Sequence, residues 1–522
     1  IKLKSLTKMQ IFGKTFYITL IAIFLVEVMS FLGHFYSSIE LYVFVLLALL
    51  FFIFCIIKIE YGLLILLTEL FIGSFGRLFV FEFADKDISI RMVFWLIFLI
   101  VWAGRQTWFF IKKDERFLRI KELKAAKIFY LYALLFIFII WGLVNAYLNN
   151  ISFVNIFFDF NAWAFFILLL PIYEIFKHSE KFIDNLFQVF MASIIWLSIK
   201  TYILLFIFSH NIFSLMPDIY TWVRDTRIGE LTQMQEGFTR IFFQSHIFVL
   251  VGVFVAAVFL LKYFQKLFEN NDKIIFKKFF NKNFFIYLLL LSFFISVNLI
   301  SFSRSNWLGL IAALFLFFII VLRLLKIKKT LYFLGVFLLS CILSLSLIAV
   351  TVKFPYPDSQ TNFNAAKLLS ERAKTVSGEA GVSSRWSLLP ELWGEIKKAP
   401  IAGKGFGAEV TYKSSDPRVL EKNPDGLYTT YAFEWGWLDI WLKIGLFGLL
   451  IYAALIFLII YKIIWPIIKY GKFNLNFKNG FKLSLTIGLA AIAIINFFSP
   501  YLNHPLGIGY LLLLTFFLDN DE

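Results

Sequence analysis

The residues most able to do chemistry in this 522-residue chain are charged side chains beside or inside long apolar stretches. Ionisable groups at such positions cost free energy, so they are functional candidates. The basic members of this set are Arg77, Arg224, Arg227, Arg240, Arg304 and Arg385. Arginine stays charged and presents a planar fork that binds phosphate oxygens through paired hydrogen bonds. Several of these arginines together would suit an anionic lipid headgroup, especially a diphosphate.

Each arginine also has a structural interpretation, in which it extends toward water or pairs with a nearby acid. Arg224 and Arg227 have such partners in Asp225 and Glu230, within the segment WVRDTRIGE. Arg240 and Arg304 interrupt apolar segments with few acids, at points where a membrane span is expected to begin or end. The diphosphate interpretation is therefore strongest for the second pair.

One acid, Glu434, lies at the beginning of the apolar segment FEWGWLDIWLKIGLFG, residues 433–448. A carboxylate can act as a general base that removes a proton from an attacking hydroxyl group. The alternative is an acid at a helix start that accepts hydrogen bonds from backbone amides. Asp439 and Lys443 are four residues apart with the acid first, which predicts a structural pair within one helix.

Other sequence patterns for catalysis are weak. Asp85 and Asp87 form a D-x-D that could hold a divalent cation, although acidic outer loops are common. The segment GKGFG lacks the flanking elements and the GK[ST] ending of a phosphate loop, so it is predicted to be a turn. H-E-x-x-H and G-x-S-x-G motifs are absent. Cys55 and Cys341 both lie in apolar runs, which excludes a disulfide framework. No metal or cofactor is expected.

The composition requires a membrane to position these side chains. The chain is 60% hydrophobic, 20% aromatic and only 16% charged, outside the range of soluble proteins. Its net charge of +16 comes from short basic clusters between apolar runs, which indicates orientation in a bilayer rather than nucleic-acid binding.

Apolar runs of about 20 residues can each cross the bilayer as a helix. The sequence predicts an all-α polytopic membrane protein with about 14 spans, within a range of 12 to 14 because the last two could form one hairpin. The predicted spans are residues 14–34, 39–57, 62–81, 89–111, 126–147, 153–173, 183–209, 238–262, 284–302, 305–323, 330–352, 437–464, 481–499 and 503–518.

Alternate connections between these spans are rich in lysine, which predicts that both termini are cytoplasmic. Two long connections, residues 210–237 and 353–430, then lie on the outer side. Loops of this length are usually functional. The predicted organisation is a first bundle (1–352), a large outer loop (353–430) and a last bundle (431–522). Within the loop, residues 386–398 have the periodicity of an amphipathic helix that could lie on the membrane surface.

Three segments in order resemble the O-antigen ligase and O-antigen polymerase superfamily. They are SRSNWLGLIAALF (303–315), SRWSLLPELWGEIKKAPIAGKGFG (384–407) and EWGWLDIWLKIGLFGLL (434–450). The resemblance covers about 150 residues, from 303 to 450, and extends to the earlier half only in topology.

This resemblance implies a GT-C-like, metal-independent glycosyltransferase of the bacterial cytoplasmic membrane, with its active site facing outward. The family moves a glycan from an undecaprenyl (polyprenyl) diphosphate carrier to an acceptor hydroxyl of a glycan, lipid or protein. Its arginines hold the diphosphate, and a His in the third segment is the proposed base. Alignment on Leu438 and Gly445 places Glu434 at that His position.

The expected site is therefore Glu434 as general base and Arg385 as a catalytic arginine, with Arg240, Arg304, Arg385, Arg224 and Arg227 binding the diphosphate. Two alternatives stay open. One is a transporter or flippase of lipid-linked glycans, although the sequence shows no convincing internal repeat. The other is a protein O-oligosaccharyltransferase, which differs in its acceptor.

Overall fold

The structure is a computed structural model that describes residues 11–83, 86–114, 128–179, 181–234, 237–269, 281–359 and 380–517, with a few isolated positions between them. In these residues, eleven helices are long and apolar enough to cross a membrane, or twelve if one bent pair is counted. They are α1 (Lys14–Phe35), α2 (Ser37–Ile57), α4 (Ile90–Ile111), α6 (Ile128–Leu148), α9 (Phe182–Ser209), α11 (His246–Glu269), α12 (Lys282–Ile300), α13 (Arg304–Leu324), α14 (Ile327–Val352), α18 (Gly436–Tyr470) and α19 (Phe477–Ile495).

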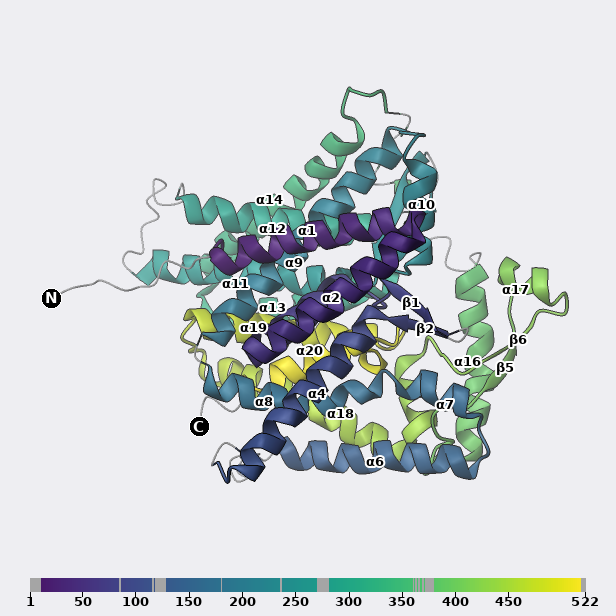
Figure 1. The fold of residues 1–522 in the computed structure, drawn as a ribbon. Helices are drawn as coiled ribbons and strands as arrows, with labels where there is room; N and C mark the ends of the chain where they lie inside the picture. Colours follow the sequence, from purple (N-terminus) through teal and green to yellow (C-terminus); the bar gives the residue numbers. More distant parts are fainter. Residues whose placement is uncertain are drawn as a thin grey trace.

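Shorter elements connect these helices (Figure 1). The helical ones are α3 (Ile59–Ile72), α7 (Phe153–Phe160), η1 (Trp163–Leu168), α8 (Leu169–His178), α10 (Met216–Asp225), α16 (Ala380–Lys398), α17 (Pro417–Lys422), η5 (Tyr501–Asn503) and α20 (Pro505–Thr515). Three antiparallel hairpins are formed by β1 (Val80–Phe83) with β2 (Lys86–Ser89), β3 (Gly229–Gln233) with β4 (Thr239–Phe243), and β5 (Val410–Lys413) with β6 (Leu427–Thr430).

The prediction of an all-α polytopic membrane protein is confirmed. Among the described residues, the candidate spans reach the lower end of the predicted range of 12 to 14 when the bent pair is counted, and fourteen is not confirmed. The predicted span 153–173 is a broken element, bent by 45° between α7 and the η1–α8 segment. The predicted spans 62–81 and 503–518 correspond to α3 and α20, of only 14 and 11 residues. Every residue of α20 from Leu506 to Thr515 is buried. These two runs are apolar because protein surrounds them, and composition alone does not separate that environment from lipid.

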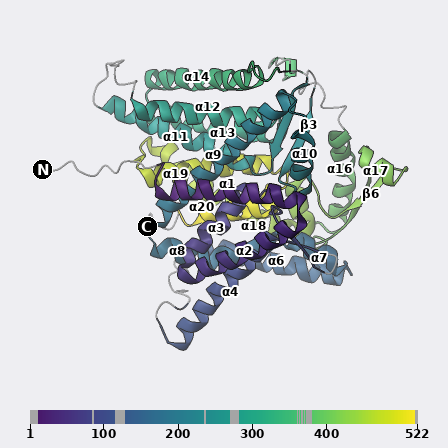
Figure 2. The same ribbon diagram turned by 45° about the horizontal axis from the view of Figure 1, so that its top comes forward.

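The helices run in alternating directions, so their connections collect at two ends of the bundle. Figure 1 and Figure 2 both place α10, α16 and α17 at one end and α8 toward the other. The two long connections predicted to share a side therefore meet at the same end. Helix α11 lies at the centre and packs against α9, α12 and α19. In its most apolar stretch, 89% of the residues are buried inside the protein.

The predicted amphipathic helix of the outer loop is confirmed as α16, which starts earlier than expected and ends before Pro400. Its apolar face does not lie on the membrane surface. Leu388, Leu392 and Ile396 are buried against Val410 of β5 and Leu442 of α18. Other parts of the protein bury this apolar face, and this packing attaches α16 to the start of α18.

The Gly-rich turn after α16 docks into a break in α18. Gly445 has φ of +73°, a conformation that strongly favours glycine, and this interrupts the helix. The turn supplies partners for backbone groups on both sides of the break. The Leu446 amide donates to the Pro400 carbonyl at 3.1 Å, and the Lys404 amide donates to the Leu442 carbonyl at 2.6 Å. The GKGFG segment is therefore a structural turn, as its composition predicts.

Candidate active site

A cavity of about 690 Å³ lies at the end of the bundle that carries the strands and α16. Its walls come from the β3–β4 hairpin, the start of α13, α16, the residues before α18, and the segment from Phe498 to Leu506. Four of the six predicted site residues line it: Arg240, Arg304, Arg385 and Glu434. Segments separated by almost 200 residues in the sequence therefore contribute to one charged site.

Arg240 reaches the cavity because of strand alternation. Successive side chains of β4 point to opposite faces. Arg240 and Phe242 line the cavity, whereas Ile241 and Phe243 are fully buried on the other face. The Arg240 Nε donates to the Ser301 carbonyl at 2.8 Å, and its guanidinium lies 5.0 Å from the centre of the Phe242 ring. Arg240 also forms an ion pair with Glu230, at 3.5 Å.

Arg304 is the first residue of α13, and the helix start itself faces the cavity. Ser303 is the N-cap and accepts a hydrogen bond from the Asn306 amide. Ser303, Arg304 and Ser305 all line the cavity. The N-terminus of a helix carries partial positive charge and free N–H groups. An anion in this part of the cavity would meet a helix dipole and an arginine together.

Arg385 and Glu434 form an ion pair within the cavity. Their side chains keep 38% and 48% of their exposure, so both are accessible to a substrate. Trp435 fixes the geometry around them, because its Nε1 donates to the Arg385 carbonyl at 3.0 Å. The Trp435 ring also contacts the rings of Trp386 and Phe498, with centroids 5.4 and 5.6 Å apart. The pair joins α16 to the short segment that precedes α18.

Residues 286–453 match the family model described as O-antigen ligase. The match confirms the predicted resemblance of this segment to the O-antigen ligase and polymerase superfamily. The matched family indicates ligase-type activity and a glycosyltransferase-like enzyme. No curated protein and no solved structure matches the chain.

The O-antigen ligase match extends from α12 into α18, so it includes all three segments that carried the resemblance. Arg304, Arg385 and Glu434 lie inside the matched segment, whereas Arg240 lies before it. The cavity therefore combines residues of the ligase segment with a strand from the earlier half of the chain.

Two of the predicted diphosphate ligands do not reach this ligase-family cavity. Arg224 lies in α10 and Arg227 in the turn before β3, and both are exposed outside the cavity lining. The acids predicted to pair with these arginines contact other groups. Glu230 pairs with Arg240, and Asp225 lies 3.8 Å from the ring of His34.

The acidic D-x-D segment is only partly described, because Asp85 lies outside the described residues. Asp87 forms an ion pair with Arg77. Within the part of the chain that the structure covers, no three His, Cys, Asp or Glu side chains gather so as to hold a metal ion.

The predicted pair of Asp439 and Lys443 is confirmed, with Nζ and Oδ1 2.6 Å apart. The pair belongs to a larger polar cluster that the sequence did not predict. Asp159 of α7 also contacts Lys443, and the Asn503 side chain donates to Asp439 at 2.5 Å. All of these groups except Asp159 and Asn503 belong to α18. The cluster ties the start of α18 to α7 and η5, so its role is structural.

Several cavity residues were missed by the sequence reasoning. Ser499, Tyr501 and His504 come from the turn between α19 and α20. The Tyr501 hydroxyl donates to the Gln244 carbonyl at 3.2 Å. Burial, together with the Arg91 cation, lowers the pKa of His504 to about 3, so this ring stays neutral at ordinary pH. The polar residues of the segment SPYLNHPLG could have indicated this part of the site, since they lie between two apolar runs.

Proposed function

We propose that this protein transfers a glycan from a polyprenyl diphosphate carrier to an acceptor hydroxyl in the described cavity. The single observation that carries the proposal is the gathering of three arginines and one accessible carboxylate around one space, Arg240, Arg304, Arg385 and Glu434. Arginines suit the diphosphate of the donor, and a carboxylate suits the proton of the acceptor.

The transfer step proposed here uses one base and an electrostatic clamp. The acceptor hydroxyl gives its proton to the Glu434 carboxylate while its oxygen bonds to the anomeric carbon. The bond between that carbon and the diphosphate oxygen breaks, and its electron pair leaves with the diphosphate. Arg240, Arg304 and Arg385 hold the charge on the leaving group. Groups preorganised toward developing charge contribute strongly to catalysis.

The ion pair between Arg385 and Glu434 links the two halves of this step. Without a donor, the guanidinium neutralises the carboxylate. A diphosphate competes for the same guanidinium, because its oxygens accept the same paired hydrogen bonds. Donor binding therefore releases Glu434 to accept a proton. The proposal predicts that the donor binds before the acceptor.

We also propose the fold type, location and carrier that the family implies. The bundle is GT-C-like, the protein resides in the bacterial cytoplasmic membrane with both termini inside, and the cavity faces outward. The arginines replace a metal ion, so transfer continues in the presence of a chelator. The donor carrier is undecaprenyl diphosphate or a related polyprenyl diphosphate. The acceptor is a glycan, lipid or protein hydroxyl, which divides ligase, polymerase and protein-transferase variants of the same reaction.

The test uses purified protein with labelled polyprenyl-diphosphate glycan and candidate acceptors. Wild type is expected to form product, whereas Glu434→Gln and Arg385→Ala are expected to lose it. Arg304→Ala should raise the donor KM, and Arg224→Ala is its matched control because Arg224 is exposed outside the cavity lining. Full transfer by both Glu434→Gln and Arg385→Ala would overturn the mechanism. Movement of the carrier between leaflets without transfer would support a transporter instead.

A further inference from the structure

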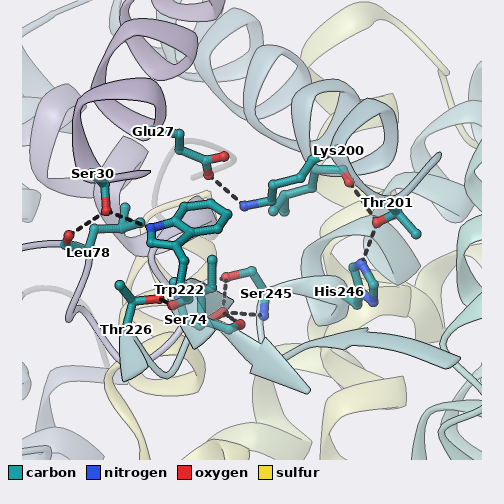
Figure 3. A network of polar contacts seen from close by, with 12 residues as sticks. Glu27, Ser30, Ser74, Leu78, Lys200, Thr201, Trp222, Thr226, Ser245 and His246 are labelled. Carbon is teal, nitrogen blue, oxygen red and sulfur yellow. Dashed lines mark hydrogen bonds and ion pairs between the residues drawn. The ribbon is translucent and has the colours of Figure 1, made fainter. Parts of the chain in front are cut away.

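A buried ion pair joins α1 to α9 away from the cavity. The Lys200 Nζ lies 2.6 Å from the Glu27 Oε1, and the two side chains are only 7% and 4% exposed (Figure 3). Removing two charges from water offsets most of their attraction, so such a pair is weak evidence for stability. Ionisable groups in membrane helices are instead functional candidates.

This pair lies against the buried face of β4. The Lys200 Nζ is 4.6 Å from the centre of the Phe243 ring. The next residue, Thr201, contacts the His246 Nε2 at 2.9 Å (Figure 3). The His246 Nδ1 accepts from the Phe243 amide at 3.3 Å. Because Nδ1 is the acceptor, the ring proton belongs on Nε2, which donates to the Thr201 hydroxyl. Helix α9 thus supports the end of β4 through both a cation and a hydrogen-bond chain.

The same open end of the hairpin, where Gly229 pairs with Phe243, is also held by a serine contact. The Ser74 hydroxyl donates to the Ile228 carbonyl at 2.6 Å, just before β3, and the Ser74 amide donates to the Ser245 hydroxyl at 3.0 Å, just after β4. Ser74 and Ser245 contact each other (Figure 3). Both are fully buried. Both strands of the hairpin are therefore anchored from the bundle side.

The consequence for the cavity follows from strand alternation. Phe243 points to the buried polar network, so Arg240, Phe242 and Gln244 point to the opposite side, where all three line the cavity. A shift of the strand on its supports would move the Arg240 guanidinium directly. Small displacements of positioning groups can cost large factors in rate or affinity.

We propose that Glu27, Lys200 and His246 are positioning residues that set the placement of Arg240 toward the diphosphate. This inference rests on the proposed function, because it assumes that Arg240 binds the diphosphate. The three residues touch neither substrate nor cavity in this role. They act through Phe243 and the backbone of β4.

The test is a mutant cycle that measures the binding of farnesyl diphosphate as the probe. Binding is monitored by the quenching of tryptophan fluorescence from the cavity. Arg240→Ala is expected to weaken binding by about tenfold or more, because it removes a charge-assisted hydrogen bond. Glu27→Gln combined with Lys200→Met removes both charges and should weaken binding by about threefold to tenfold. Adding this double change to Arg240→Ala should weaken binding no further. His246→Gln should behave in the same way.

The outcomes separate this inference from the proposed function. If Arg240→Ala binds farnesyl diphosphate as wild type does, the proposed diphosphate clamp fails. If Arg240→Ala weakens binding but the network variants leave it unchanged, or weaken it additively, the positioning role is wrong. Glu174→Gln is the control for loss of a half-buried, hydrogen-bonded acid, since Glu174 accepts from Trp102 and Gln106 outside the cavity lining. Restored binding in Glu27→Asp with Lys200→Arg would support positioning by the ion pair.

A second observation concerns a different surface, a groove of about 500 Å³ between α2 and α4. It is lined by Phe52, Ile56, Ile100, Val101, Gly104, Arg105, Trp108 and Phe109. A Cβ added at Gly104 would meet nothing within 4 Å, so this glycine leaves the groove open. Figure 2 shows the C-terminal end of α4 projecting away from the bundle.

Cations gather toward one end of this apolar groove. Arg105 lies in its lining, and the Lys112 Nζ is 5.0 Å from the centre of the exposed Trp108 ring, with Lys113 next along the chain. An apolar trough that leads to positive charge and an interfacial tryptophan matches an acyl chain with an anionic headgroup. We infer that the groove binds one anionic phospholipid.

Native mass spectrometry of the protein with phosphatidylglycerol or phosphatidylethanolamine tests this site. Phosphatidylglycerol should be retained in preference, and both Gly104→Leu and Arg105→Gln should reduce its retention severalfold. Gly335→Leu is the matched control, because Gly335 of α14 is also open to its surroundings but lines no groove described here. Equal retention of the two lipids by wild type, or equal losses in Gly104→Leu and Gly335→Leu, would refute the site.

Discussion

Replacement of Glu434 by glutamine is the most direct test of the chemistry in the cavity. Glutamine keeps the shape of the side chain and its ability to hydrogen-bond, but it cannot take up a proton at ordinary pH. The change therefore removes the proposed base and little else. It also breaks the charge interaction with Arg385, whose effect on stability has to be considered first.

The exposure of the pair makes that effect small. The Arg385 and Glu434 side chains are 38% and 48% exposed, and ion pairs at such positions contribute about 0–1 kcal/mol. General base catalysis contributes roughly 100- to 10,000-fold to a rate. Glu434→Gln is therefore expected to lower kcat by roughly two to four orders of magnitude, while the melting temperature changes little.

The assay is single-turnover glycan transfer, with melting temperature measured on the same samples. Glu409→Gln is the matched control, because Glu409 is an exposed acid of the outer loop outside the cavity lining. Glu434→His is expected to restore part of the activity, with the acid limb of the rate profile at higher pH, because an imidazole has a higher ordinary pKa than a carboxyl group. Undiminished transfer by Glu434→Gln would refute the reasoning, as would an activity loss that follows unfolding.

Four further predictions concern the loop, the clamp, the turn histidine and metals. Gly445→Ala should lower stability by about 1–3 kcal/mol or more, since φ is +73° and a Cβ would lie 2.1 Å from the Ile401 carbonyl oxygen; Gly394→Ala, with nothing within 4 Å, should leave the melting temperature unchanged or raise it. Arg304→Lys should raise the donor KM in steady-state kinetics because lysine lacks the planar fork. The pKa of His504 is about 3 in the folded protein, below the ordinary value of 6.5. Between these two values the unfolded chain binds a proton at His504 that the folded protein does not, so stability falls as the pH drops from 6.5 toward 3. Thermal melts of His504→Gln should show a smaller loss over that window, and a loss equal to wild type would contradict this. Transfer measured in EDTA should match transfer without it, and a loss reversed by added Mg²⁺ would show a required metal.

Much of the bundle could be predicted because the bilayer dictates the length of a helix that faces it. The boundaries of α1 and α2 lie within two residues of those expected from their apolar runs. The prediction failed where an apolar helix is surrounded by protein. Helices α3 and α20 have the composition of a span but not its length, since burial among other helices selects the same residues as lipid does.

The candidate site was predictable residue by residue but not as an arrangement. Glu434 and Arg304 stand out because a charge beside an apolar run is costly. The sequence favoured Arg240 over Arg227, whose segment is richer in acids, but it did not predict the structure that separates the two side chains. The difference arises from the β3–β4 hairpin, whose alternation turns Arg240 into the cavity and leaves Arg227 in an exposed turn. The polar turn with Tyr501 joined the site only through tertiary packing.

The docking of the Gly-rich turn into the break of α18 also determines how this protein can be recombined with relatives. The amides of Lys404 and Leu446 each bond across the junction, so the two segments exchange backbone partners. Gly403 and Gly445 approach too closely for any added side chain, since a Cβ on either would lie within 3 Å of the other segment. A chimera that swaps the outer loop alone would join two surfaces that were never fitted to each other. The exchangeable cassette is the whole stretch from α16 through the break in α18.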